Sequence, residues 1–223
     1  MNVIFRINKV IFLSIFILLS SCKIIDVDEE KNYLINLSSV GGITSYKGIP
    51  YTGKMVKYVD DEKTQLKWEK TYKEGKLKGL SEEYNRDGQL KSRRTYKDGK
   101  EDGQIERFYE NGKLEYRGTY KDEKEDGQIE RFYENGKLEY RGTYKDGKED
   151  GQIERFSENG QLESRGTYKD GKEDGQWEYY FDGQLESRGT YKDGKEDGQW
   201  ELYDENGKFV EKVRFIDGVK QDD

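Results

Sequence analysis

Apolar and polar positions alternate along most of the chain after residue 50, which is typical of half-buried β-strands. Each alternating run is about seven residues long and is bounded by a turn signal such as Asn111-Gly112 or Asp98-Gly99. These dipeptides favour two-residue type I′ turns, because both central residues of that turn need positive φ. Glycine is too frequent for helices, and no apolar stripe of helical period appears. The pattern predicts an all-β chain of consecutive antiparallel hairpins.

The hairpins recur with a period of 24 residues, and residues 102–125 and 126–149 differ only at Glu123 versus Gly147. Such a period predicts about seven stacked repeats within residues 43–221, forming one elongated, twisted antiparallel meander. Residues 43–51 are expected to form a cap strand of half a repeat. The expected repeats are 53–78, 79–102, 103–126, 127–150, 151–174, 175–197 and 198–221.

A two-residue turn at Asn111-Gly112 fixes which residues face each other. One face receives the pairs Tyr109–Leu114, Arg107–Tyr116, Ile105–Gly118 and Gly103–Tyr120, and the other receives Phe108–Glu115, Glu106–Arg117 and Glu110–Lys113. The opposite charges and the glycine beside a bulky side chain support this register.

The sixth repeat is one residue shorter than the others. A three-residue loop at Asp182–Gln184 would keep Trp177 opposite Gly189 and would pair Tyr179 with Ser187 and Phe181 with Leu185. In the second TYKD motif, Glu123 replaces the glycine of the turn, which predicts either a strained positive φ or a different turn type.

The N-terminus carries Arg6 and Lys9, then an apolar run over Val10–Leu19 that is too short to span a bilayer. The run ends in Leu19-Ser20-Ser21-Cys22, which resembles a bacterial lipobox. The resemblance implies a signal peptide over 1–21, cleaved before Cys22. Cys22 would then carry lipid, such as palmitate, and anchor the chain to a membrane. Residues 22–42 would be a tether to the repeat array.

Composition excludes several classes of function. There is no histidine, and Cys22 is the sole cysteine, so Ser–His–Asp triads, Cys–His nucleophiles and His-based metal sites are ruled out. Removing residues 1–21 would change the formal charge from −7 to −9, which disfavours nucleic-acid binding. We expect no enzyme activity and no cofactor.

The acidic motif Asp98-Gly-Lys-Glu-Asp102-Gly103 partly matches a calcium-binding loop. The match fails at the third position, which is Lys100, and at the twelfth, which is Tyr109. We therefore interpret the motif as a solvated joint between strands, with weak Ca²⁺ binding as the alternative.

Two sets of aromatic residues are candidates for binding a partner protein. The first set recurs once per repeat on the charged face, and its alternative role is to pack into neighbouring repeats as part of a thin core. It consists of Tyr58, Tyr84, Phe108, Phe132, Phe156, Tyr180 and Tyr203. The second set is specific to the two near-identical repeats, and serine takes most of its places elsewhere. It consists of Tyr109, Tyr116, Tyr133 and Tyr140. Because serine is tolerated there, we expect these four to form a contact patch outside the core.

The pattern G-x-[W/I]-x-x-[F/Y]-x-x-x-G-x-[L/F], followed by a tyrosine and a Gly-Lys turn, resembles the MORN-repeat variant of bacteria. That family includes YwqK-type antitoxins, and the opening segment Ile49-Pro50-Tyr51-Thr52-Gly53-Lys54 is similar as well. The resemblance covers residues 43–221 and implies stacked β-hairpins that associate with proteins or membranes. Together with Cys22, it predicts a lipid-anchored, non-catalytic interaction protein of the cell envelope, exposed outside the cytoplasm. An immunity protein against an envelope-acting or incoming toxin is the alternative.

Overall fold

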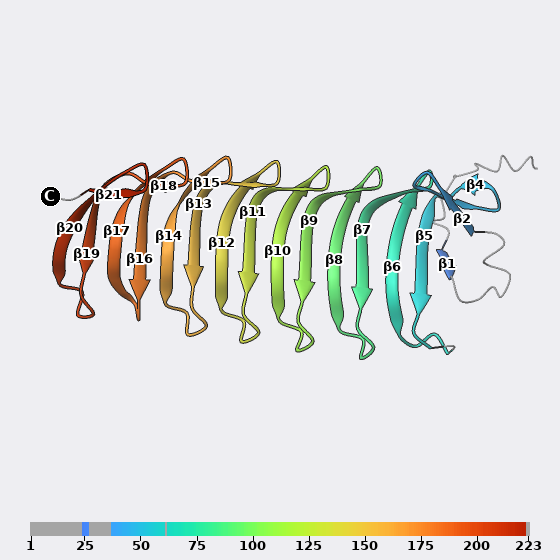
Figure 1. The fold of residues 1–223 in the computed structure, drawn as a ribbon. Helices are drawn as coiled ribbons and strands as arrows, with labels where there is room; N and C mark the ends of the chain where they lie inside the picture. Colours follow the sequence, from blue (N-terminus) through green and yellow to red (C-terminus); the bar gives the residue numbers. More distant parts are fainter. Residues whose placement is uncertain (1–23, 27–36, 61, 222–223) are drawn as a thin grey trace, which may run out of the picture.

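The computed structural model describes residues 24–26, 37–60 and 62–221. Over these residues the chain is all β, and its main body is one sheet of 18 strands in which hairpins follow one another in sequence order (Figure 1). This confirms the predicted elongated antiparallel meander. Among the described residues there is no helix long and apolar enough to cross a membrane.

The strands of the main sheet are β1 (Ile24–Asp26), β5 (Gly53–Tyr58), β6 (Leu66–Lys73), β7 (Lys76–Tyr84), β8 (Leu90–Lys97), β9 (Lys100–Phe108), β10 (Leu114–Lys121), β11 (Lys124–Phe132), β12 (Leu138–Lys145), β13 (Lys148–Phe156), β14 (Leu162–Lys169), β15 (Lys172–Glu173), β16 (Gly175–Phe181), β17 (Gln184–Lys192), β18 (Lys195–Glu196), β19 (Gly198–Tyr203), β20 (Phe209–Ile216) and β21 (Val219–Gln221). A second, three-stranded sheet contains β2 (Leu37–Val40), β3 (Ile43–Tyr46) and β4 (Ile49–Pro50).

The N-terminal end differs from the single cap strand expected over 43–51. That segment forms two short strands, β3 and β4, which belong to the second sheet. Part of the expected tether is also ordered, since β1 pairs in parallel with β5 and buries Ile25 beside Met55. The first repeat is therefore covered by a segment that sequence periodicity could not assign.

The loops at the Asn-Gly edge have three residues, not the expected two. Gly112 N–H donates to the Tyr109 carbonyl at 2.9 Å, and Tyr109 N–H donates to the Lys113 carbonyl at 2.9 Å. Only Gly112 has positive φ, at 80°, while Asn111 keeps negative φ and its side chain accepts from Lys113 N–H. This is a type I turn followed by a glycine in the left-handed region.

A bulge one residue farther on restores the predicted register. Leu114 pairs with Phe108, so the predicted pair Tyr109–Leu114 is wrong and Glu115 is the extra residue. Beyond the bulge, Tyr116 faces Arg107 and Gly118 faces Ile105, as predicted.

The short sixth repeat shows the complementary arrangement. Its loop has two residues, Asp182 and Gly183, with φ of 46° and 78°, so the expected three-residue loop is wrong. Phe181 consequently pairs with Gln184 instead of Leu185. The predicted pairs Trp177–Gly189 and Tyr179–Ser187 are nevertheless present.

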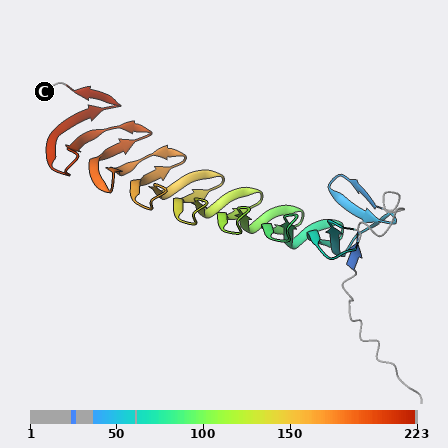
Figure 2. The ribbon, with the colours of Figure 1, turned by 90° about the horizontal axis from the view of Figure 1, so that it is seen from below.

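At the opposite edge, the Asp-Gly turns join one hairpin to the next, and we call them the joint turns. Asp98 and Gly99 have φ of 52° and 92°, as the predicted type I′ turn requires. Each joint turn is also tied to the preceding repeat, as in the 2.8 Å hydrogen bond from Gly99 N–H to the Leu77 carbonyl. Seen from below, the repeats are curved hooks that follow one another across the picture (Figure 2).

The curvature coincides with a wide bulge after each joint turn. Tyr120 pairs with Glu125 and Gly118 with Ile129, so three residues of β11 lie opposite Thr119 alone. The central one is Gly127, with φ of 125°. The glycines of the 24-residue period therefore lie where the strands bend. The bend turns the part of each hairpin near the joint turn towards the inner face of the rest.

The joint turn at Glu123 keeps its type, and Glu123 adopts φ of 70°. Replacing Glu123 with glycine is therefore expected to stabilise the fold by about 1 kcal/mol, because the strained φ costs a non-glycine residue that much. Reversible urea unfolding of the two proteins would measure the difference.

Gly147 is the matched control, since it occupies the same turn in the next repeat with φ of 84° and only the Lys124 side chain within 4 Å of a built Cβ. Gly147→Glu should destabilise by a similar amount. Equal stability of Glu123→Gly and the natural protein would show that Glu123 is not strained.

Candidate interaction surface

The two faces of the sheet have different chemistry. The inner face carries the buried clusters. The larger cluster contains Ile105, Tyr116, Ile129, Tyr140, Ile153 and Trp177, and the smaller contains Ile25, Tyr51 and Met55. The outer face carries charged residues and the recurring aromatic column. A candidate surface for a partner is therefore the outer face, and the inner face supplies stability.

On the inner face, large side chains alternate with glycine along a row that crosses the strands. Ile105 faces Gly118, which faces Ile129, which in turn faces Gly142. A Cβ at Gly118 would collide with the Tyr116 ring and with Ile129. Glycine is thus required so that the neighbouring side chains can lie flat across the strand.

Tyr116 and Tyr140 belong to this core, and the expectation that they lie on an exposed patch is wrong. Their exposed fractions are 6% and 5%. Tyr116 lies across Gly118, and its hydroxyl is 3.0 Å from both the Tyr120 hydroxyl and the Glu125 carboxylate. Arg107 covers its ring at 5.0 Å.

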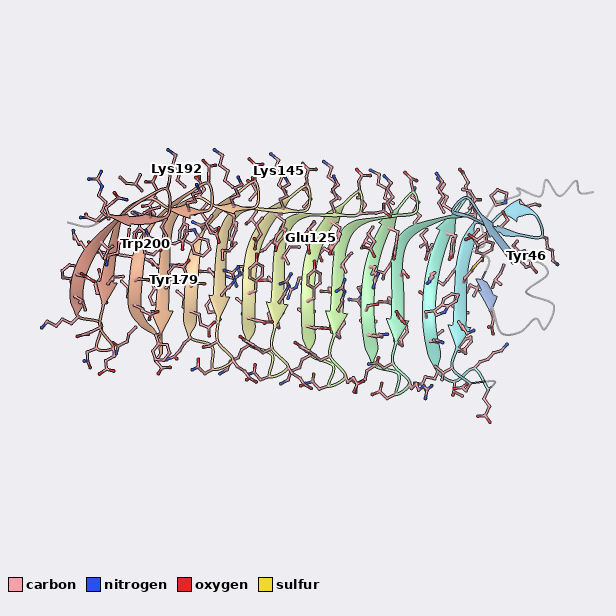
Figure 3. The ribbon with its side chains drawn as sticks, viewed as in Figure 1. Tyr46, Glu125, Lys145, Tyr179, Lys192 and Trp200 are labelled. Atoms are coloured by element: carbon pink, nitrogen blue, oxygen red, sulfur yellow. The ribbon has the colours of Figure 1, made fainter. Side chains whose placement is uncertain are left out.

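At two equivalent positions, serine is tolerated because a tryptophan of the following strand fills the same space. Where Ser164 replaces the tyrosine, Trp177 lies over Gly166. Where Ser187 replaces it, Trp200 lies over Gly189 and stacks on Tyr179 at 6.2 Å (Figure 3). From Tyr116 to Trp200 the core is therefore built either from tyrosine with isoleucine or from serine with tryptophan, whereas Ser92 is followed by Ile105.

Tyr109 and Tyr133 lie at the loop edge and are also structural. The Tyr109 hydroxyl donates to the Phe132 carbonyl at 2.6 Å, and the Tyr133 hydroxyl donates to the Phe156 carbonyl at 2.7 Å. The Asn111 side chain adds a hydrogen bond to the Glu134 carbonyl at 3.0 Å. The structure does not bring the four tyrosines together as one patch; two are buried and two link neighbouring loops.

The acids of the joint motif also have structural partners. Glu125 and Glu149 point to the tyrosines of the inner face, and Glu149 accepts from the Tyr140 hydroxyl at 2.7 Å. Asp126 accepts from Asp146 N–H in the next joint turn at 3.3 Å. Within the described ranges, no group of three or more Asp, Glu, Cys or His side chains could hold a metal ion.

The aromatic column lies on the outer face, and none of its seven described members belongs to either buried cluster. All seven are half-buried. The bulge after each loop places a leucine directly opposite most of them, which the expected two-residue loops would not have done. We call this combined feature the outer ribbon; its pairs are Tyr58–Leu66, Tyr84–Leu90, Phe108–Leu114, Phe132–Leu138, Phe156–Leu162, Tyr180–Leu185 and Tyr203–Phe209.

Beside the outer ribbon runs a row of charged residues, here called the charge ladder. Apart from the adjacent acids Glu69 and Glu82, acid and base alternate across successive strands. Its members are Glu69, Glu82, Arg93, Glu106, Arg117, Glu130, Arg141, Glu154, Arg165, Glu178, Arg188, Glu201 and Lys212.

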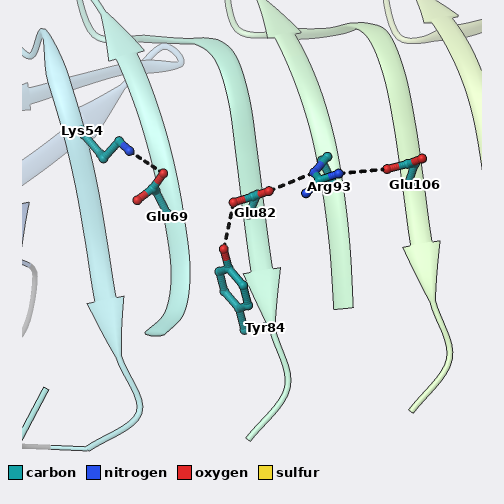
Figure 4. A network of polar contacts seen from close by, with 6 residues as sticks. All are labelled: Lys54, Glu69, Glu82, Tyr84, Arg93 and Glu106. Carbon is teal, nitrogen blue, oxygen red and sulfur yellow. Dashed lines mark hydrogen bonds and ion pairs between the residues drawn. The ribbon is translucent and has the colours of Figure 1, made fainter. Parts of the chain in front are cut away.

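Close contacts connect the charge ladder from strand to strand. Arg93 lies 2.9 Å from Glu82 and 3.4 Å from Glu106, while Lys54 pairs with Glu69 at 2.5 Å (Figure 4). Such exposed pairs contribute about 0.2–1 kcal/mol each. The ladder therefore contributes modestly to stability and presents an ordered row of charges to solvent.

Tyrosines of the outer ribbon turn their hydroxyls towards the charge ladder. Tyr84 donates to Glu82 at 2.8 Å, and burial together with this carboxylate raises the pKa of Tyr84 to about 12. At the C-terminal end, the Tyr203 hydroxyl, Arg188 and Lys212 lower the pKa of Glu201 to about 2. The Glu201 carboxylate therefore remains charged well into the acidic range.

Two shallow grooves on the outer face adjoin the ladder. One, of about 390 Å³, is lined by residues that include Gln176, Arg188, Thr190 and Glu201. Its equivalent one repeat earlier has about 360 Å³ and includes Gln152 and Arg165. The outer face thus combines two equivalent polar grooves with a continuous row of apolar side chains. Protein-binding surfaces combine polar and apolar areas in this way.

The fold and this surface define a tandem β-hairpin repeat protein. Its inner face holds the buried side chains that stabilise the fold, and its outer face carries the candidate interaction surface. Six segments, which together make up more than half of the chain, match the family described as MORN repeat variant, and the chain belongs to that family. The matched residues are 77–98, 101–122, 125–146, 149–170, 173–193 and 196–217. MORN repeats suggest a repeat-based protein-interaction module.

Comparison with other proteins adds little to this assignment. Among curated proteins, none matches the chain significantly. A structure titled "Crystal Structure of TarM" is 18% identical over 40% of this chain and 18% of that chain, with a TM-score of 0.27. An S. aureus TarM mutant in complex with fondaparinux, alpha-GlcNAc-glycerol and UDP is 18% identical over 43% of this chain and 19% of that chain, with a TM-score of 0.29. The chain thus spans less than a fifth of the length of these proteins.

Tyr140→Ser is expected to destabilise the fold by about 3 kcal/mol, because it empties a buried site and leaves Glu149 without its closest hydroxyl donor. Adding Ile153→Trp should restore much of the loss, since it reproduces the arrangement of Ser164 and Trp177. Denaturant unfolding of the single and double variants would measure both effects. A single variant as stable as the natural protein would show that Tyr140 is not part of the core.

The buried tyrosines predict unfolding in alkali. Burial raises the pKa of Tyr116 and Tyr140 in the folded protein. Their contribution to the free energy of unfolding is therefore complete below the ordinary tyrosine pKa of 10.0, and it is lost as the pH rises through the raised pKa of the folded state. We expect tyrosinate absorbance and loss of β-structure to rise together in one cooperative step above pH 10. Independent ionisation near pH 10 with unchanged circular dichroism would contradict this prediction.

Proposed function

We propose that this chain is a lipid-anchored, non-catalytic protein of the bacterial cell envelope that binds another protein along its outer face. The single observation that carries the binding part is the outer ribbon, a row of half-buried aromatic and leucine side chains flanked by the charge ladder. Aromatic side chains supply large contact area at interfaces, and ordered charges set register and partner choice.

The anchoring part rests on the sequence around Cys22, which lies outside the described residues. Two or more acyl chains give stable membrane attachment, because each buried CH₂ contributes about 0.8 kcal/mol. At about 4.8 Å per strand, 14 strands would extend nearly 70 Å. An array anchored in this way would present a binding surface well beyond the lipid headgroups.

The experiment is photo-crosslinking in intact cells, with the crosslinker on Leu114 or Leu138 of the outer ribbon. A defined partner should crosslink to the natural protein. The triple variant Phe108→Thr, Phe132→Thr and Phe156→Thr should lose most of that product, because threonine suits a strand but removes the aromatic contact area.

The matched control replaces three exposed lysines at the joint edge, Lys121→Thr, Lys145→Thr and Lys169→Thr, and should keep the crosslink. Thermal melts must show that both triple variants are folded. An unchanged crosslink in the folded phenylalanine variant would overturn the outer ribbon as the binding surface. A product identified as a toxin would favour the immunity role over a general envelope function.

Cys22→Ser tests the anchor in the same cells. The variant should leave the membrane fraction and lose the mass of its acyl chains. Retention of Cys22→Ser in the membrane fraction would contradict lipid anchoring at this residue.

A further inference from the structure

The alternating inner row is interrupted at three successive strands near the N-terminal end. Lys70 and Arg94 take the places that later repeats give to Gly118 and its equivalents, and Ser81 takes the place of Ile105. The register runs directly from Lys70 to Ser81, then to Arg94. Charged and small polar side chains thus replace the packed core in this segment alone among the described repeats.

A cavity occupies this interruption. It has a volume of about 360 Å³, and it separates the small buried cluster around Met55 from the large one that begins at Ile105. Its walls include Trp68, Lys70, Ser81, Ser92, Arg94 and Tyr96. Because isoleucine or tryptophan fills the equivalent space elsewhere, the opening arises from these substitutions.

Lys70 and Arg94 can each form further ion pairs or hydrogen bonds with a ligand in the cavity. The Lys70 ammonium lies 5.0 Å from the centre of the Trp68 ring, and among the described residues no carboxylate is within ion-pair distance of it. Arg94 contacts Glu101 through one nitrogen at 2.8 Å, and a guanidinium carries five N–H donors in a planar fork.

The acids of the lining are already engaged. Glu82 pairs with Arg93 on the charge ladder at 2.9 Å, and Glu83 lies 3.6 Å from Lys91. With Lys67 also in the wall, the lining carries three cations and two acids, so its net charge is +1. A ligand with one negative charge would neutralise this net charge, whereas a dianionic phosphate would leave an excess negative charge in the cavity.

We propose that this cavity binds a small molecule bearing one carboxylate. Lys70 and Arg94 hold the carboxylate through charge-assisted hydrogen bonds. The Ser81 and Ser92 hydroxyls contact the polar body of the ligand, and the rings of Trp68 and Tyr96 form its apolar walls. No residue of the outer ribbon lines the cavity, so this site and a partner on the outer ribbon would use different side chains.

Isothermal titration calorimetry of the purified full chain in detergent tests the site, with glucuronate and gluconate as carboxylate probes. Glucose is the neutral control and inorganic phosphate the dianionic one. At least one carboxylate should bind and raise the melting temperature, while glucose should not. No heat with either carboxylate, or tighter binding of phosphate than of both, would overturn the proposal.

Lys70→Gly combined with Arg94→Gly introduces the residue found at equivalent positions and should weaken carboxylate binding by roughly tenfold or more. Ser81→Ile fills the cavity with the residue of the later repeats, and it should abolish binding while raising the melting temperature. Lys121→Thr with Lys145→Thr removes two cations elsewhere and should bind normally. Binding that survives in folded Ser81→Ile would place the ligand outside this cavity.

Discussion

A sheet that is one layer thick can bury side chains only by bending over one of its own faces. Here the bend lies at the wide bulges after the joint turns, where Gly103, Gly127 and Gly151 adopt φ of 121–129°. The bend positions Glu125 to accept from Tyr116 and Tyr120. The inner core, the inward-facing carboxylates and the half-buried outer ribbon all depend on this conformation of one glycine per repeat.

Much of the fold follows from the sequence because the information is repeated. The period of 24 residues, the Asp-Gly joint turns and the pairing of Trp177 with Gly189 are each specified by several copies of the same pattern. The loops could not be assigned in the same way. A two-residue turn and a three-residue turn followed by a bulge give the same register beyond Tyr116, so cross-strand charge and size patterns cannot distinguish them.

The candidate surface was harder to predict, for the same reason. The choice of loop decides whether Leu114 lies on the inner face or opposite Phe108, and hence whether the aromatic column has apolar partners. The sequence alone misplaces Tyr116 and Tyr140, because serine at 164 and 187 suggests a position outside the core. The compensation by Trp177 and Trp200 comes from the next strand, and single-position comparison does not show it.

The identical register at each junction has a consequence for the length of the molecule. Residues 102–125 and 126–149 make nearly the same contacts with their neighbours, since the strands that flank them are paired in the same way. Unequal recombination within such a tandem stretch of gene would add or remove a whole unit and leave each remaining junction intact. Each event would change the reach of the array by about 10 Å, the width of two strands. The length of the protein can therefore change in evolution by whole repeats, while the side chains that each repeat exposes stay the same.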